Sequence, residues 1–215
     1  KEKGDFFELF CKYYFQIHKD LYQLKDIWLL DEAPQTVLNK LEITRDFGVD
    51  LIFETIDNKF YTIQSKFHSD RSSSPTGDFQ KTIAESKNAD GFYIFQNSLD
   101  IPSNIKKSNP HLLLLDSFLE LDESDFFVKL YKHANGKEIK VLKYEPRDHQ
   151  RKAINSVVEG FNNHSRGRYI SACGTGKTLT SLWIHEEMNV ENVLFVVPNL
   201  FLVRQTIKDW VKQRN

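Results

Sequence analysis

A glycine-rich segment at residues 171–178 has the residue types that bind the phosphates of a nucleotide. It reads Ser-Ala-Cys-Gly-Thr-Gly-Lys-Thr, and the residues expected at the nucleotide are Gly174, Thr175, Gly176, Lys177 and Thr178. Glycines let successive N–H groups point at phosphate oxygens, the lysine reaches the β- and γ-phosphates, and the Thr178 hydroxyl ligates Mg²⁺. The alternative, an incidental lysine after a turn, is disfavoured because a predicted strand precedes the segment and a predicted helix follows it.

Two segments that flank the glycine-rich loop indicate which class of nucleotide-binding protein it belongs to. Residues 145–150 read Glu-Pro-Arg-Asp-His-Gln at the start of a predicted helix, and residues 196–205 read Val-Val-Pro-Asn-Leu-Phe-Leu-Val-Arg-Gln after the next predicted strand. Together with the glycine-rich loop, they resemble the superfamily 2 helicase-like motors over residues 144–215. Ser171 stands where the strict motif has glycine, which is a mild departure because many motor ATPases carry a small residue there.

The resemblance implies roles for several residues. The Arg-x-x-Gln element, here Arg147 to Gln150, belongs to the nucleotide site, and its glutamine reads the adenine base. The element after the second strand contacts the DNA backbone, which suggests Pro198, Asn199 and Gln205. Taken alone, both glutamines would more often be solvated helix residues. The acidic box and the arginines that complete such a motor would lie beyond residue 215, so we expect weak nucleotide binding and no useful hydrolysis from these residues.

A second group of residues has the chemistry of metal-dependent phosphodiester cleavage, which needs oxygen ligands for Mg²⁺ beside a lysine. Residues 49–56 and 60–67 are β-branched and aromatic, and they predict a hairpin around a loop at 57–59. If Ile56 faces Phe60, Asp50 lies opposite Lys66, with Gln64 on the same face. A slip of one residue would separate them. The alternative is a solvated lysine and an aspartate beside a turn.

Gly48-Val49-Asp50 and Gln64-Ser65-Lys66, preceded by a helix containing Phe7-Glu8, resemble the Mrr-like branch of the PD-(D/E)xK nucleases over about residues 4–130. Gln replaces the usual acid in that branch, and Val49 stands where the motif name expects proline. The resemblance implies that Asp50 ligates the metal, that Gln64 and the Ser65 carbonyl complete the site, and that Lys66 assists catalysis. Glu8 matches the helical acid of some members; taken alone it would be helix surface.

The net charge of −1 provides no overall positive field for nucleic acid. Any nucleic-acid binding would therefore depend on local patches of lysine and arginine. His68 and Arg71 follow Lys66 and could touch phosphates, although a solvated loop is the more common role for such residues. The two cysteines have no Cys-x-x-Cys or Cys/His pattern, so neither a zinc site nor a disulfide is expected. No apolar run approaches the length of a membrane span, and no secretory signal is visible, so we expect a cytoplasmic protein without a membrane partner.

Periodicity and turn residues predict the remaining elements. Helices are expected at 5–24, 79–87, 118–132, 148–162, 177–188 and from about 200; strands are expected at 27–30, 49–56, 60–67, 91–95, 111–115, 169–170 and 192–197; loops are expected after Pro34 and at 68–78. Strand, loop, helix and strand in the last third are typical of a parallel α/β sheet.

The fold class is therefore α/β, with a restriction-endonuclease-like (PD-(D/E)xK) domain at 1–133, a linker at 134–146, and the N-terminal part of a truncated RecA-like P-loop domain at 147–215. This order resembles the single-chain type ISP restriction-modification enzymes, with type I subunits sharing the layout. The resemblance implies Mg²⁺ and ATP as cofactors. It implies double-stranded DNA as a partner, together with the remaining motor, methyltransferase and target-recognition parts of a larger protein. Two rivals stay open: an inactive nuclease fold that docks a motor on DNA, and an RNA-remodelling helicase.

Overall fold

The structure is a computed structural model that describes residues 2–43, 48–68, 76–119, 121, 125–138 and 142–214. The chain divides into two compact units, Lys1–Ile139 and Lys140–Asn215, and each is described by itself. The exact bounds of the predicted linker stay a prediction. None of the described helices combines the length and apolarity that crossing a membrane requires.

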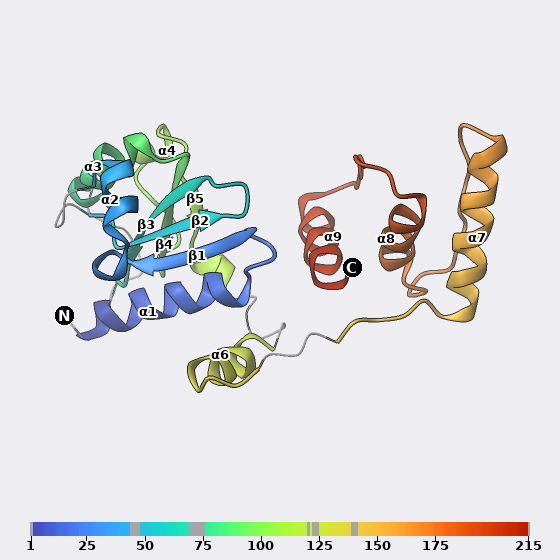
Figure 1. Cartoon of the computed structure of the whole chain (residues 1–215), viewed down its shortest axis with the longest axis horizontal. Helices are drawn as coiled ribbons and strands as arrows, with labels where there is room; N and C mark the ends of the chain where they lie inside the picture. The colour runs from blue at the N-terminus through green and yellow to red at the C-terminus, as the bar shows by residue number, and fades with distance from the viewer. Residues whose placement is uncertain are drawn as a thin grey trace. The chain divides into compact units, whose positions relative to one another are not determined.

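The first unit is built on one mixed sheet of five strands in the order β1-β2-β3-β4-β5 (Figure 1). The strands are β1 (Leu24–Leu29), β2 (Leu51–Thr55), β3 (Phe60–Lys66), β4 (Gly91–Gln96) and β5 (His111–Leu113). The first three are antiparallel, and β4 and β5 run parallel to β3. The predicted strands of this unit are thus present, with β1 starting three residues earlier than expected.

Helices cover both faces of this sheet (Figure 1). Helix α1 (Glu2–Ile17) buries Cys11, Tyr14 and Phe15 against the face that carries Phe53 and Phe95. On the other face lie α2 (Gln35–Leu41), α3 (Thr76–Glu85) and α4 (Ser103–Lys106). Because strand side chains alternate, each face receives every second residue; one apolar cluster forms under α1 and two form on the opposite face.

Three helix predictions in this unit need correction. Helix α1 ends at Ile17 instead of residue 24, and turns lead through Gln23, at φ 49°, into β1. The loop predicted after Pro34 contains α2, which the spacing of its buried residues Val37, Leu38 and Leu41 could have indicated. The helix predicted at 118–132 is replaced by α5 (Leu115–Leu119) and α6 (Phe126–Ala134). Between them, Leu121 is buried.

The predicted hairpin is present, but its register differs by two residues from the one assumed. Glu54, instead of Ile56, lies opposite Phe60, because the connection spans four residues, 56–59. Thr55 closes this turn: its N–H donates to Lys59 O at 2.9 Å, and its Oγ1 accepts from Lys59 N at 3.1 Å. A shift of two residues keeps every side chain on its predicted face, and it places Asp50 beside Gln64 instead of opposite Lys66.

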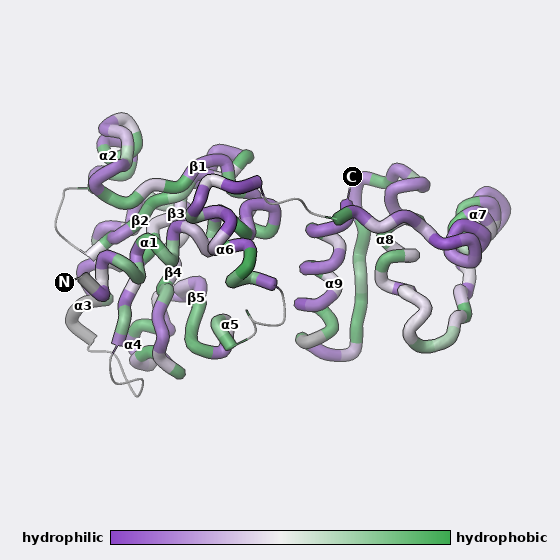
Figure 2. The backbone as a smooth tube through the Cα atoms, turned by 90° about the horizontal axis from the view of Figure 1, so that it is seen from below, coloured by the Kyte–Doolittle hydropathy of each residue, from purple (hydrophilic) through white to green (hydrophobic). Residues whose placement is uncertain are grey.

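The second unit contains α7 (Asp148–Asn163), α8 (Lys177–Met188) and α9 (Leu200–Gln213). The strands predicted at 169–170 and 192–197 are wrong as strands: both segments are extended but unpaired, and residues 142–214 contain no assigned strand. A strand needs a neighbour to satisfy its backbone groups, and no described segment lies in register beside either. Figure 2 shows the extended segment before α9 as apolar, and Leu194 and Val196 point into solvent.

Candidate functional site

Asp50 immediately precedes β2, an interior strand of the sheet, and is held by three hydrogen bonds. Its N–H donates to Ile63 O at 2.9 Å, its carbonyl accepts from Leu30 N at 2.9 Å, and its Oδ2 accepts from Ser65 N at 2.7 Å. Burial raises the pKa of the carboxyl to about 6, against the opposing effects of the Ser65 hydrogen bond and the charge of Lys66. The side chain is therefore a partly desolvated acid with a fixed orientation.

Gln64 brings a buried amide oxygen to the same place. It is only 3% exposed, and its Oε1 has no hydrogen-bond partner among the described residues. Since Asp50 bonds to both Ile63 and Ser65, the intervening Gln64 is its neighbour across the hairpin. A buried oxygen without a partner costs about 1–3 kcal/mol, and a bound cation would remove that cost. A carboxylate beside an orphaned amide oxygen fits a hard divalent cation.

Lys66 ends β3, two residues after Gln64, so its side chain leaves the sheet on the same face. Its charge is one of the effects that lower the pKa of Asp50. The strand register therefore puts Asp50, Gln64 and Lys66 on one face of the sheet, although the pairing differs from the predicted one. Within the described residues, no three His, Cys, Asp or Glu side chains are grouped to hold a metal, so a cation here would depend on amide or carbonyl oxygens as well.

Glu8 reaches this site from α1. Burial first, and then the charges of Asp50, Asp5 and Asp31, raise the pKa of its carboxyl to about 7. Asp50 is the largest of these charge effects, so the two carboxyl groups are electrostatic neighbours. Asp31, one of these charges, was not predicted from the sequence to lie near the site. It follows β1 in a short 3-10 turn, and its only signal in the sequence was an acidic residue at the end of a strand.

His68 forms part of a clamp between the ends of two strands. Its N–H donates to Asn97 Oδ1 at 2.6 Å, and Asn97 Nδ2 donates to His68 O at 2.8 Å. These bonds give the residue a structural role at the end of β4, in place of the solvated loop that was the alternative. Arg71 lies outside the described residues.

The glycine-rich loop of the second unit has the predicted backbone. Gly174 and Gly176 have φ values of 75° and 78°, and α8 begins at Lys177. Lys177 Nζ spans the loop and donates to Ala172 O at 2.7 Å and to Ser171 O at 3.2 Å. The Ser171 hydroxyl bonds to Thr175 Oγ1 at 2.6 Å. The loop is therefore preformed in the described residues.

Gln150 supports this loop from α7. Its side chain is 5% exposed; Oε1 accepts from Arg147 N at 2.8 Å, and Nε2 donates to Thr175 O at 3.0 Å. A Cβ at Gly176 would lie 2.7 Å from Gln150 Nε2. The alternative of a solvated helix residue is wrong, because the side chain is buried, its oxygen bonds to the start of α7 and its nitrogen bonds to the loop.

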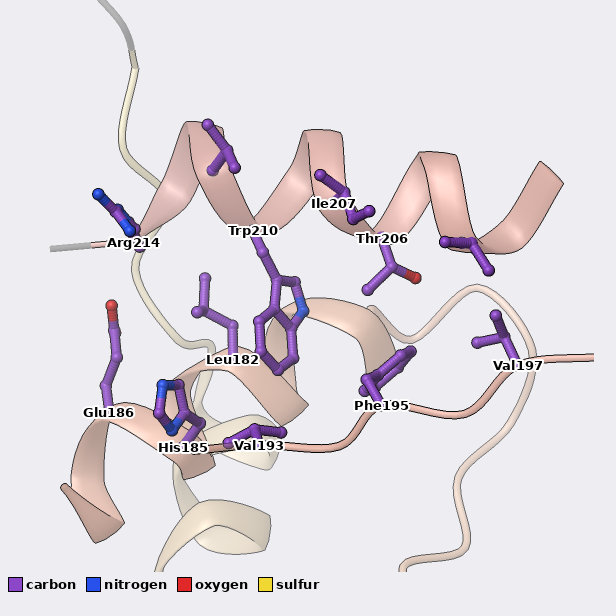
Figure 3. A pocket seen from close by; sticks show the side chains of 12 residues that line it. Leu182, His185, Glu186, Val193, Phe195, Val197, Thr206, Ile207, Trp210 and Arg214 are labelled. Carbon is purple, nitrogen blue, oxygen red and sulfur yellow. The ribbon is translucent and has the colours of Figure 1, made fainter. Parts of the chain in front are cut away.

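The remaining predicted residues of this unit lie at the start of α9. Asn199 caps this helix, with its Oδ1 accepting from Leu202 N at 2.9 Å, while Pro198 and Gln205 are exposed. A groove lies between α8, α9 and the extended segment before α9, lined by Leu182, His185, Phe195 and Trp210 (Figure 3). Trp210 Nε1 donates to Thr178 O at 3.0 Å, so α9 is tied directly to the first turn of the phosphate-loop helix.

Comparisons with known proteins find a different similarity for each unit. Residues 18–108 match the Mrr-type catalytic domain of restriction endonucleases, and residues 143–214 match the res subunit of type III restriction enzymes. No curated protein matches the sequence significantly.

Among solved structures, the chain resembles the ATP-dependent type ISP restriction-modification enzyme LlaBIII bound to DNA. The TM-score is 0.71 at 22% identity, and the match covers 99% of this chain and 14% of that one. At this identity the likeness shows the fold, and it confirms the predicted α/β class with a restriction-endonuclease-like and a P-loop part. The chain thus carries one segment similar to restriction endonucleases of the Mrr type and a second segment similar to the res subunit of type III restriction enzymes, in a fold that resembles a type ISP restriction-modification enzyme.

Proposed function

We propose that the first unit is an Mg²⁺-dependent DNA endonuclease whose reaction is the hydrolysis of a phosphodiester bond. The observation that carries this proposal is the pairing of the Asp50 carboxylate with the orphaned, buried oxygen of Gln64 on one face of the sheet. Lys66 supplies a positive charge to the same face. The match of residues 18–108 to restriction endonucleases gives this arrangement its reaction class.

The roles follow from the donor chemistry of each group. Asp50, Gln64 Oε1 and the Ser65 carbonyl would hold Mg²⁺, which supplies an electrophile for the phosphate and an acidified water. The ammonium group of Lys66 steadies the attacking water and the charge that develops on the phosphate. The Ser65 N–H fixes the Asp50 carboxylate toward the site, and Glu8 adds a second carboxyl from α1.

The second unit is proposed to bind ATP with Mg²⁺ and to belong to a DNA-translocating motor. The loop of 174–178 would hold the phosphates, Thr178 would ligate Mg²⁺, and Gln150 with Arg147 would form the adenine side of the site. The chain spans 14% of the type ISP enzyme that it matches. We therefore place it within a larger cytoplasmic enzyme that acts on double-stranded DNA and adds further motor, methyltransferase and target-recognition parts.

Nicking of supercoiled plasmid in Mg²⁺ tests the nuclease directly. The parent should convert supercoiled to open-circular DNA, and Asp50→Ala and Lys66→Ala should each lower the rate at least about a hundredfold, as expected for losing a catalytic group. Asp20→Ala and Lys19→Ala are matched controls, because both residues are exposed in the turn after α1. Equal nicking by the Asp50→Ala variant would exclude this site.

One observation favours a second candidate, an inactive nuclease fold that docks a motor on DNA. The described residues contain no cluster of three metal-binding acids, histidines or cysteines. Under this alternative the protein binds duplex DNA with the same affinity in EDTA and in Mg²⁺, and it does not nick plasmid even in the complete enzyme with ATP.

A further inference from the structure

A chain of buried hydroxyl groups connects α3 to the two strands of the hairpin. Thr62 Oγ1 lies 2.6 Å from Ser86 Oγ, Ser86 Oγ donates to Thr82 O at 2.6 Å, and Thr82 Oγ1 donates to Gly48 O at 2.7 Å. Each hydroxyl has one proton. Because Ser86 donates its proton to Thr82 O, Thr62 must be the donor in its bond to Ser86. All three side chains are buried.

The chain ends on the peptide that leads into Asp50. Gly48 has a φ of 110°, in the region that favours glycine, and a Cβ built on it would lie 3.1 Å from Thr82 Oγ1 and 3.4 Å from Thr82 N. Gly48 is therefore packed closely against α3, and a side chain at this position would require Thr82 to shift. At its other end the chain starts on Thr62, two residues before Gln64 on the same face of β3.

An apolar residue at position 82 could not make the hydrogen bond to Gly48 O. A valine would fill the same volume in this buried position, but it would leave Gly48 O without this donor, because a methyl group cannot replace the hydroxyl. The hydrogen bonds described above hold Asp50 from Leu30, just after β1, and from Ile63 and Ser65 of β3. Thr82 supplies the contact from the helical layer, immediately before the aspartate.

We infer that Thr82 is a positioning residue for the reaction: its hydroxyl holds the Gly48 peptide so that the Asp50 carboxylate stays bonded to Ser65 N and directed toward Gln64. The inference rests on the proposed role of Asp50 as a metal ligand. It gives α3 a part in the site that neither the motif residues nor the strand register indicates.

The test compares Thr82→Val with Thr82→Ser by amide hydrogen exchange of the metal-free chain and by plasmid nicking in Mg²⁺. In Thr82→Val, exchange of the Ser65 N–H should accelerate roughly three- to tenfold relative to amides of β4, the size expected from one buried hydrogen bond. The catalytic rate constant should fall by a similar factor while the affinity for DNA is unchanged. Thr82→Ser, which keeps the hydroxyl, should restore both, and Thr36→Val, at an exposed position of α2, should change neither.

Two outcomes would overturn the inference. One is unchanged exchange of the Ser65 N–H in Thr82→Val; the other is an equal acceleration of all amides, which would mean a general loss of stability. Because exchange is measured without metal or DNA, it decides the role of Thr82 even if the parent does not nick plasmid. Failure of the parent to nick would instead count against the proposed nuclease.

Discussion

Two carboxyl groups from different parts of the first unit are partly desolvated: Asp50, immediately before β2, and Glu8 on α1, whose pKa the charge of Asp50 also raises. Burial is the main cause of the raised pKa in both, which is about 6 for Asp50 and about 7 for Glu8. Such an arrangement is unfavourable for an empty site at neutral pH and favourable once a cation is bound. The region therefore has the electrostatics of a site prepared for a positive ligand.

The raised pKa of Glu8 predicts how stability depends on pH in the absence of divalent cations. Between the ordinary value of 4.5 and about 7, the folded state keeps a proton that the unfolded chain has released, so stability falls as the pH rises through this window. Glu8→Gln removes this ionisation. The free energy of unfolding of the variant, measured in urea, should therefore rise relative to that of the parent from pH 5 to pH 8.

Glu42 provides the contrast for that experiment. Its hydrogen bonds to Asn88 and Lys87 lower the pKa of its carboxyl, so the stability it contributes is present above the ordinary value and is lost only as the pH falls further. Glu42→Gln should therefore shift stability by a constant amount across pH 5 to 8. A parallel response of the two variants would show that Glu8 is not a raised acid.

The unpartnered oxygen of Gln64 predicts that its removal leaves the protein at least as stable but abolishes its response to Mg²⁺. Replacing this residue with methionine, which is similar in length, removes the unpartnered oxygen, so the free energy of unfolding in EDTA should stay equal or rise by about 1 kcal/mol. The rise in Tm that Mg²⁺ produces in the parent should disappear, because ligand binding stabilises only a state that binds it. Gln80→Met, exposed on α3, should keep the Mg²⁺ response; its loss there too would contradict a role specific to Gln64.

At the scale of the elements, hydrogen bonds between side chains and backbone atoms hold the segments that carry these groups. The four-residue turn closed by Thr55 determines which residue of β3 faces Asp50, and the bond from Thr82 to Gly48 O holds the start of β2. In the second unit, Gln150 of α7 holds the phosphate loop, and Trp210 of α9 bonds to its helix. In both units a helix fixes the loop that carries the chemistry.

The two loop glycines form a matched pair for testing this support. Both have positive φ, so alanine at either position should cost about 1 kcal/mol of backbone strain. Only at Gly176 would the new Cβ also meet Gln150 Nε2, at 2.7 Å, whereas nothing lies within 4 Å at Gly174. Gly176→Ala should therefore weaken binding of a fluorescent ATP analogue much more than Gly174→Ala, in equilibrium titrations. Equal losses would mean that the contact with Gln150 is unimportant for the loop.

At the scale of the whole molecule, the proposed nuclease site and the proposed ATP site lie on separate units of one chain. The net charge of −1 would leave any DNA contacts to local groups. A nuclease and an ATP-binding loop on different units predict that single substitutions can separate the two activities.

In the complete enzyme, Lys66→Ala should abolish DNA cleavage and leave DNA-stimulated ATP hydrolysis near the parental rate. Lys177→Ala should have the reverse effect on ATP hydrolysis, because the lysine that contacts the β- and γ-phosphates is lost, and it should abolish only the ATP-dependent part of cleavage. Parallel assays of both variants check this, and loss of both activities in either one would contradict independent sites.

Local pattern was sufficient for much of this protein. The phosphate loop is contiguous, so its glycines, lysine and threonine could be identified from order alone, and alternation along β2 and β3 put Asp50, Gln64 and Lys66 on one face. A register error of two residues did not change that face, because the side-chain period of a strand is two. Helix α2 was missed although its buried residues have helical spacing, since Pro34 was taken as the start of a loop.

Contacts between distant residues were decided only by the tertiary structure. The hydroxyl of Thr82 and the carbonyl of Gly48 are 34 positions apart, and the charge of Asp50 acts on Glu8 from another part of the unit, so no local pattern could show either interaction. Segment 192–197, whose sequence predicts a strand, likewise stays unpaired. The sequence by itself determined which side chains are candidates for the proposed chemistry; their pairing, their desolvation and their support required the fold, because hydrogen bonding and burial depend on neighbours in space.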